Sequence, residues 1–146
     1  TIKPMDLALS LAEDAAALGE APVGAGIVEG DMVLAAERNR MRELGDPTAH
    51  AEMLAIRAAL AKRGTGRLDG CDLYVTLEPC AMCAGAIAHA RLRRLYFGAG
   101  DRKAGAVEHG VRLFAQTTCH HRPEIIAGLG EARAAALLQA FFRDRR

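Results

Sequence analysis

The sequence predicts an α/β domain of three layers, α/β/α, built around a mixed five-stranded sheet. Two apolar, strand-like segments flank the turn Glu29-Gly30-Asp31, and beyond them helix-like and strand-like segments alternate. The length of 146 residues is that of one domain, and a hydrophobic fraction of 51% is ordinary for a packed core. Residues 1–146 are therefore expected to form a single domain.

The strands are predicted from short apolar segments bounded by turn residues. Between them, the polar segments 38–47 and 64–70 are expected to be loops, and 105–119 a loop with a short helix. The five strands are expected at Val23–Val28, Met32–Glu37, Asp72–Leu77, Arg94–Gly98 and Glu124–Ala127.

The helices are predicted from their start and stop signals. Gly19 ends an Ala/Leu-rich first helix, Thr48 is expected to cap the second, and Pro79 is expected to open the third. The helices are expected at Met5–Leu18, from Thr48 through His50 to about Lys62, at Cys80–His89 and, amphipathic and closing the fold, at Glu131–Arg143.

The charge is nearly balanced but unevenly distributed. Nineteen Lys and Arg against 18 Asp and Glu give +1, which argues against a protein that coats nucleic acid or an acidic membrane. Residues 1–73 carry −4, whereas residues 74–146 carry +5 and four of the five His. A local basic surface is therefore expected after about Arg91.

Composition also bears on the compartment. No apolar run is long enough to span a bilayer, so no membrane partner is expected, and Thr1–Asp6 does not resemble a signal peptide. Four cysteines in 146 residues are too sparse for a disulfide scaffold. We expect a reducing compartment, most simply the cytoplasm.

The segment Pro79-Cys80-Ala81-Met82-Cys83 carries the first chemical signal. Two thiols three residues apart at a helix start lie on one face, where the helix dipole favours the metal-binding thiolate. Alone, this spacing fits a redox pair, half of a structural zinc site or two buried small residues.

The segment His50-Ala51-Glu52 narrows these alternatives. His50, Cys80 and Cys83 make three ligands suited to Zn²⁺, and three protein ligands leave a position for water, which is the pattern of catalytic zinc. A carboxylate beside such a water can move its proton. In mid-helix, residues two apart diverge by about 200°, so the motif requires a helix end that faces the pocket.

Together, His-x-Glu and Pro-Cys-x-x-Cys resemble the signature of the zinc-dependent cytidine deaminase-like superfamily. The wider similarity is to its bacterial tRNA adenosine deaminase family and covers nearly the whole chain. It is carried by Ala21–Ala25, Asn39, Asp46–Glu52, Leu73–Gly85, Phe97–Ala99 with Asp101, His121-Arg122 and Phe141–Arg143.

The resemblance implies a cytidine deaminase-like fold that converts adenosine to inosine at the wobble position of tRNA. One Zn²⁺ per chain would be held by His50, Cys80 and Cys83, and Glu52 would shuttle protons. The implied substrate contacts are Asn39, Pro22, Val23, Ala51 and Asp101. The implied partners are a tRNA anticodon stem-loop and a second copy of the chain, with RNA contacts at Arg122, Phe142, Arg143, Arg145 and Arg146.

Some residues depart from the family pattern or have a plainer interpretation. Arg38 stands where the family often has Trp, His120 where Asn is common, and the segment 107–118 is unlike that of well-known members. Asn39 and Asp101 can instead satisfy loop backbone. We expect Glu78 to order backbone, and we expect no second metal site at Cys119, His120 and His121.

Three other functions remain open from the sequence. A deaminase of a free nucleobase or nucleoside, of guanine, cytosine or adenine type, would share the fold. A non-catalytic zinc module that binds RNA would need a fourth protein ligand, and His120 or His121 could supply it. A redox protein would use the Cys80 and Cys83 thiols without metal.

Overall fold

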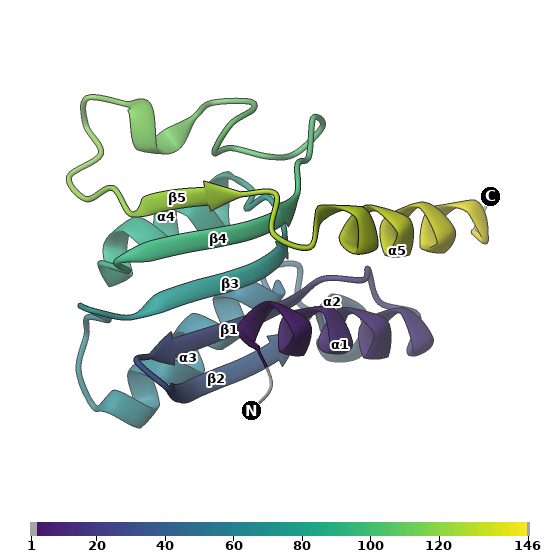
Figure 1. Ribbon diagram of the computed structural model, residues 1–146, viewed down its shortest axis with the longest axis horizontal. Coiled ribbons are helices and arrows are strands. Elements are labelled where there is room, and N and C mark those ends of the chain that lie inside the picture. Colours follow the sequence, from purple (N-terminus) through teal and green to yellow (C-terminus); the bar gives the residue numbers. More distant parts are fainter. Residues whose placement is uncertain (1–2, 146) are drawn as a thin grey trace.

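The computed structural model describes residues 3–145 and contains a mixed five-stranded sheet in the order β2-β1-β3-β4-β5 (Figure 1). β1 pairs antiparallel with β2 and with β3, whereas β3, β4 and β5 run parallel. The strands are β1 (Gly24–Glu29), β2 (Met32–Arg38), β3 (Asp72–Leu77), β4 (Arg94–Ala99) and β5 (Glu124–Ala127). The predicted mixed sheet is confirmed, and each strand lies within two residues of its expected bounds.

Helices cover both faces of the sheet, which gives the predicted three layers. On one face lie α1 (Pro4–Ala17) and α5 (Glu131–Arg143), and on the other lie α3 (Ala51–Arg63) and α4 (Ala81–Ala90) (Figure 1). Each face has its own buried cluster, and the larger one lies beneath α3 and α4. Within the described residues, no helix is both long enough and apolar enough to cross a membrane.

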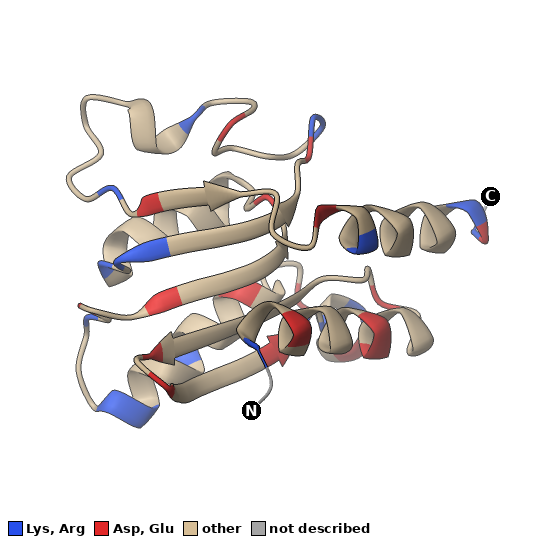
Figure 2. Ribbon diagram, viewed as in Figure 1, with Lys and Arg blue, Asp and Glu red and all other residues tan. Residues whose placement is uncertain are grey.

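Charged residues occur on both halves of the molecule. Figure 2 shows acidic residues along α1, and basic residues on the turn after β4 and near the end of α5. Several arginines of the second half are engaged, because Arg93 pairs with Asp72 at 2.8 Å and Arg94 with Glu124 at 2.7 Å. The basic surface expected after Arg91 is therefore partly neutralised by acidic neighbours.

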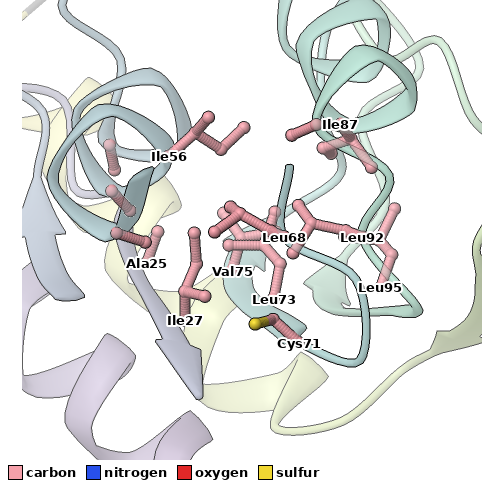
Figure 3. Close-up of a cluster of buried hydrophobic side chains, with 14 of the residues drawn as sticks. Ala25, Ile27, Ile56, Leu68, Cys71, Leu73, Val75, Ile87, Leu92 and Leu95 are labelled. Atoms are coloured by element: carbon pink, nitrogen blue, oxygen red, sulfur yellow. The ribbon is translucent and has the colours of Figure 1, made fainter. Parts of the chain in front are cut away.

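Alternation along the strands builds the two clusters. Leu73 and Val75 of β3 point into the larger cluster (Figure 3), whereas Tyr74 between them faces α1 and α5. Tyr74 is paired in register with Tyr96 of β4, and the two rings stack with centroids 4.2 Å apart. β3 therefore contributes side chains to both clusters, as expected for a strand covered by helices on both faces.

Two helix starts differ from the sequence prediction. Thr48 does not cap α3, because the Asp46 carboxylate accepts hydrogen bonds from both its backbone N–H and its hydroxyl, each at 2.8 Å. The N-cap is instead His50, in extended geometry. Likewise α4 begins at Ala81, with Cys80 as its N-cap.

The segment expected to be one polar loop contains a short helix, α2 (Met41–Leu44). Its first turn is stabilised by Glu20, a buried residue whose carboxylate accepts the backbone N–H groups of Arg42 and Glu43. The stabilising group is thus more than twenty residues away in sequence. Farther along, the 105–119 segment contains the expected short helix, a 3₁₀ turn at Leu113–Ala115.

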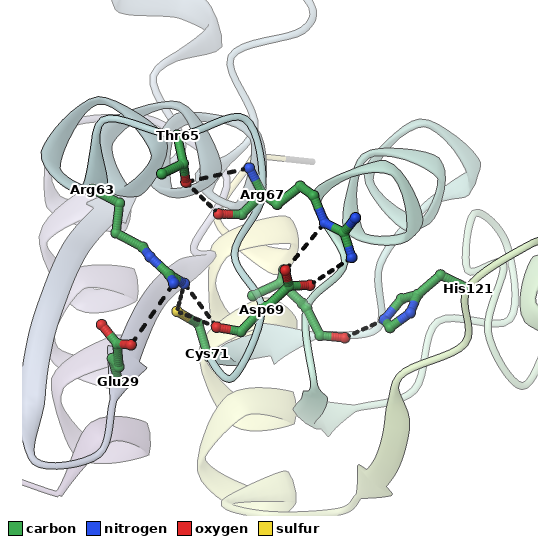
Figure 4. Close-up of polar contacts among 8 residues, drawn as sticks. Glu29, Arg63, Thr65, Arg67, Asp69, Cys71 and His121 are labelled. Carbon is green, nitrogen blue, oxygen red and sulfur yellow. Dashed lines mark hydrogen bonds and ion pairs between the residues drawn. The ribbon is translucent and has the colours of Figure 1, made fainter.

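Polar contacts fix the loop that follows α3 (Figure 4). Arg63 donates to the backbone carbonyl of Asp69 at 2.7 Å and to the sulfur of Cys71 at 3.1 Å. Nearby, His121 donates from Nε2 to the carbonyl of Leu92 at 2.6 Å. Cys71 and His121 thus help to hold the loops at this end of the molecule by hydrogen bonds.

Candidate active site

The site lies where β3 and β4 end and where α3 and α4 begin. α4 starts a few residues after β3, and the N-terminus of α3 is brought to the same edge of the sheet. His50 and Cys80 are the N-cap residues of the two helices, and Cys83 lies in the first turn of α4. The geometric condition on the His-x-Glu spacing is met, because the end of α3 faces the pocket.

His50, Cys80 and Cys83 form a metal-ligand group. The Nδ1 atom of His50 lies 3.6 Å from the Sγ of Cys80 and 3.5 Å from the Sγ of Cys83. For a tetrahedral ion with Zn–S of about 2.3 Å and Zn–N of about 2.0 Å, the expected N–S separation is about 3.5 Å. The donor set and its spacing therefore fit Zn²⁺.

No other cluster of this kind is found in residues 3–145. His50, Cys80 and Cys83 form the one group of three His, Cys, Asp or Glu side chains there whose ligand atoms lie within 4.8 Å of one another. Cys119 and His121 are engaged with backbone carbonyls instead. A fourth protein ligand from His120 or His121, which a closed structural zinc site would need, is therefore absent from this group.

Cys80 and Cys83 interact closely, and their pKa values shift in opposite directions. A hydrogen bond from the Cys83 thiol, and then the His50 ring, lower the pKa of Cys80 to about 4, and the same coupling raises the pKa of Cys83. Cys80 also raises the pKa of His50, because thiolate and imidazolium attract. A cation bound between these groups would displace the protons that they carry.

Glu52 lies beside the ligand group in the first turn of α3 and is only 4% exposed. Burial raises the pKa of its carboxyl to about 7. Bound Zn²⁺ would add a nearby positive charge that favours the carboxylate. A buried carboxyl beside the ligand group can both accept and return a proton.

A cavity of about 650 Å³ opens above these residues. Of the predicted substrate contacts, Val23, Asn39 and Asp101 lie on its wall. Pro22 and Ala51 do not, because both are fully buried behind the wall.

Asn39 joins the elements that frame the cavity. Its side-chain oxygen accepts the backbone N–H of Ala51 at 2.7 Å, and its amide nitrogen donates to the carbonyl of Ala21 at 3.3 Å. Asn39 therefore fixes the start of α3, and with it His50 and Glu52. The amide nitrogen carries a second N–H, which can be offered to a ligand.

The turn after β4 supplies a charged rim. Arg102 and Lys103 are exposed and line the cavity, and within residues 3–145 neither forms an ion pair. Asp101 uses one carboxylate oxygen to accept the backbone N–H groups of Lys103 and Ala104, which closes the turn. The plainer role considered for Asp101 is thus realised, and its second oxygen remains for a ligand.

The C-terminal helix contributes an aromatic wall. Phe142 lines the cavity and is 55% exposed, whereas Phe141 packs edge-on against it and lies beneath the Arg145 guanidinium at 3.7 Å. Arg143 is exposed and lies 3.8 Å from Asp144. Arg146 lies outside the described residues.

Arg122, expected to contact RNA, is occupied within the protein. Its guanidinium donates to the carbonyls of Phe114 and Gln116, and it ties down the 113–116 segment. The cavity wall also contains apolar residues that were not predicted from the sequence, among them Met41, Leu77 and Leu138. Leu138 could not be recognised, because it shares an i,i+4 stripe with core positions.

Fold and site together define a zinc-dependent deaminase. Residues 2–99 match the cytidine and deoxycytidylate deaminase zinc-binding region. The chain is 55% identical over 142 residues to the tRNA-specific adenosine deaminase of Agrobacterium fabrum, which covers 97% of this chain and 93% of that protein. It belongs to the family of tRNA-specific adenosine deaminases.

Solved structures agree with this assignment. A structure from a study of A-to-I editing by tRNA:A34 deaminases at the wobble position superposes with a TM-score of 0.91 at 55% identity, over 92% of this chain and 98% of that one. A guanine deaminase from Nitrosomonas europaea superposes with a TM-score of 0.77 at 28% identity, over 94% and 82% of the two chains. The fold is therefore shared by deaminases of different substrates.

Proposed function

We propose that this protein hydrolyses adenosine to inosine at the wobble position of tRNA, with residues 1–146 as one deaminase domain. The observation that carries the proposal is a three-ligand zinc site beside a buried carboxyl on the wall of a cavity of about 650 Å³. That volume is in the range of small-molecule sites and admits one flipped nucleoside. The 55% identity to a tRNA-specific adenosine deaminase supports this substrate over a free base.

In the proposed reaction, water adds to C6 of the adenine and ammonia leaves. Zn²⁺ held by His50, Cys80 and Cys83 would supply Lewis acidity toward the attacking water. Glu52 would take one proton from the attacking water and pass it to N1 of the ring. It would then take the remaining proton from the new C6 hydroxyl and deliver it to the amino group, which leaves as ammonia. The C6–O bond forms, the C6–N bond breaks, and the products are inosine and ammonia.

The cavity wall would hold the nucleoside for this chemistry. Val23 offers an apolar contact to the base, and Asn39 offers its second amide N–H to the base or ribose. The free oxygen of Asp101 can accept from a ribose hydroxyl. Pro22 and Ala51 would act from behind the wall, by fixing the backbone that carries Val23 and His50.

The RNA around the flipped nucleotide would meet the cavity mouth. Arg102 and Lys103 supply positive charge for phosphates, and the exposed ring of Phe142 supplies a surface on which a flanking base can stack. With few phosphate contacts, affinity for an anticodon stem-loop should be modest and should weaken with salt, by about 0.7 log units of affinity per log unit of salt for each single-strand contact.

A free guanine is the second candidate substrate, because a guanine deaminase shares the fold. Inosine formation in a panel of anticodon stem-loops, assayed beside free nucleobases, separates the two. Turnover of the stem-loop with inert free bases is the expected result. Turnover of a free base with an inert stem-loop would contradict the proposal.

Assembly and compartment follow from the same proposal. A tRNA substrate places the activity in the cytoplasm, where the zinc thiolates stay reduced. We infer a homodimer from the similarity to the family. The half-exposed Val111 beside α4 is one apolar element available to an interface. Sedimentation at micromolar concentration tests this, and a monomer there would contradict it.

A further inference from the structure

The Glu78 side chain is fully buried directly after β3, and it accepts five hydrogen bonds from one distant segment. Its Oε1 accepts the backbone N–H of Asp101 at 2.9 Å and the Nδ1–H of His109 at 2.6 Å. Its Oε2 accepts the backbone N–H groups of Val107, Glu108 and His109 at 3.0, 2.9 and 3.1 Å. The 101–109 segment is thus wrapped around a single carboxylate.

Glycine makes this wrapping possible. A Cβ at Gly105 would lie 2.5 Å from the Cδ of Glu78 and 2.4 Å from the carbonyl oxygen of Asp101, so no larger residue fits without movement. At Gly100, a Cβ would lie 3.2 Å from the His109 ring. The segment is therefore built to fit closely over a buried negative charge, which its N–H groups compensate.

The wrapped segment is also the rim of the cavity. Residues 101–104 line it, and they include the charged side chains proposed to meet RNA. Glu78 is separated from the ligand Cys80 by Pro79 alone, so the same short stretch of chain carries the metal site and holds the rim. A shift of the Glu78 carboxylate would therefore move the rim relative to the zinc ligands.

We propose that Glu78 is a positioning residue for the substrate: it holds the 101–104 rim at a fixed place relative to the metal site. It touches neither the substrate nor the reacting atoms. The proposal rests on the proposed function for the identity of the substrate, but the contacts that define the role are within the protein. Misplacement of a binding group by about 1 Å can cost about 100-fold in rate.

The test uses Glu78→Gln, with Asp72→Asn as the matched control. Whichever Glu78 oxygen is replaced by an amide nitrogen, at least two N–H donors of the segment lose their acceptor. Asp72 is also buried and charge-paired, but it lies at the opposite end of β3, with Arg93 as its partner. Both changes remove one buried negative charge, but at opposite ends of β3.

Two measurements are made on the zinc-loaded variants. Hydrogen exchange of the backbone N–H groups of Asp101, Val107, Glu108 and His109 should accelerate in Glu78→Gln and stay unchanged in Asp72→Asn. With an anticodon stem-loop, kcat/KM should fall by about 10- to 100-fold in Glu78→Gln, mainly through a higher KM, while zinc content stays stoichiometric. Asp72→Asn should retain wild-type constants.

A second variant tests the positioning role by changing the segment and leaving Glu78 intact. Gly105→Ala keeps the Glu78 carboxylate but forces the segment away from it, so it should reproduce the exchange pattern and the higher KM. Unchanged exchange in Glu78→Gln, or kinetic losses equal to those of Asp72→Asn, would overturn the proposal. If wild-type protein does not deaminate the stem-loop but the exchange differences appear, the proposed function fails and the positioning role stands.

Discussion

Replacing Glu52 with Gln should separate catalysis from metal binding and from stability. Gln keeps the shape of the side chain but can neither accept nor return a proton at neutral pH. General acid–base groups contribute about 10²- to 10⁴-fold to rate. We therefore expect Glu52→Gln to lower kcat by at least about 100-fold, with zinc retained, because Glu52 is not one of the three ligands.

The same substitution should stabilise the metal-free protein above neutral pH. Burial raises the pKa of Glu52 from 4.5 to about 7, and this difference corresponds to about 3 kcal/mol. A raised pKa means that the unfolded chain releases the proton first, so the wild type loses stability as pH rises from 4.5 to 7. Below pH 4.5 the Glu52 carboxyl is protonated in both the folded and the unfolded wild type, so its burial no longer lowers the free energy of unfolding in this way.

Urea unfolding of chelator-treated protein at pH 5 and pH 8 measures this difference. The free energy of unfolding of Glu52→Gln should exceed that of wild type at pH 8 by an amount on the order of 3 kcal/mol, and by much less at pH 5. A difference that does not depend on pH would refute the argument from burial. Loss of zinc from the untreated variant would show that Glu52 is a ligand and that the assigned roles are wrong.

Three further changes have defined outcomes. Cys83→Ala removes a ligand, so it should abolish stoichiometric zinc binding and lower Tm. Metal analysis and thermal melting measure these two effects, and retained zinc would contradict the ligand assignment. In Gly24→Ala, the new Cβ would lie 1.9 Å from the carbonyl oxygen of Ala8 in α1, so the free energy of unfolding should fall by about 1–3 kcal/mol. Gly26→Ala is the control, because its new Cβ would have its nearest neighbour at 3.7 Å. Equal losses of stability in the two variants would argue against the clash. Burial acts to raise the pKa of Glu78, but hydrogen bonds, first from the backbone N–H of Asp101, lower this pKa to about 2. The ionised carboxyl therefore contributes about 3 kcal/mol of stability above pH 4.5, and this contribution should be lost as pH falls toward 2. Acid titration of Glu78→Gln beside wild type checks this, and identical acid midpoints would contradict it.

The predictions that succeeded rest on local patterns. β3, β5 and α5 coincide with their expected ranges, since short apolar segments and an amphipathic helix pattern are signals carried within each segment. The thiols of Cys80 and Cys83 were predicted from their spacing at a helix start. His50 lies thirty residues from Cys80, and it was added because the two motifs together have the ligand pattern of catalytic zinc.

The features that were not predicted from the sequence depend on contacts between residues that are distant in sequence. α2 is stabilised by Glu20, which lies more than twenty residues away in sequence. Phe141 and Phe142 are adjacent and chemically alike, yet only Phe142 lines the cavity. Which side chain faces the site is decided by how α5 lies on the sheet, and no pattern within α5 reports that.

The connection order of the fold explains why the chemistry gathers at one edge. α3 begins at the site and runs away from it, β3 returns, α4 begins there in turn, and β4, parallel to β3, returns again (Figure 1). Each of these strands ends next to residues of the site. β3 is followed by Glu78 and the ligand Cys80, and β4 is followed by the charged rim. Because Glu78 binds the segment that follows β4, a group at the end of one strand fixes the element that follows the next. Substitution of Glu78 should therefore move the rim while the zinc ligands stay in place, whereas substitutions at the far ends of β3 and β4, such as Asp72→Asn, should affect stability alone.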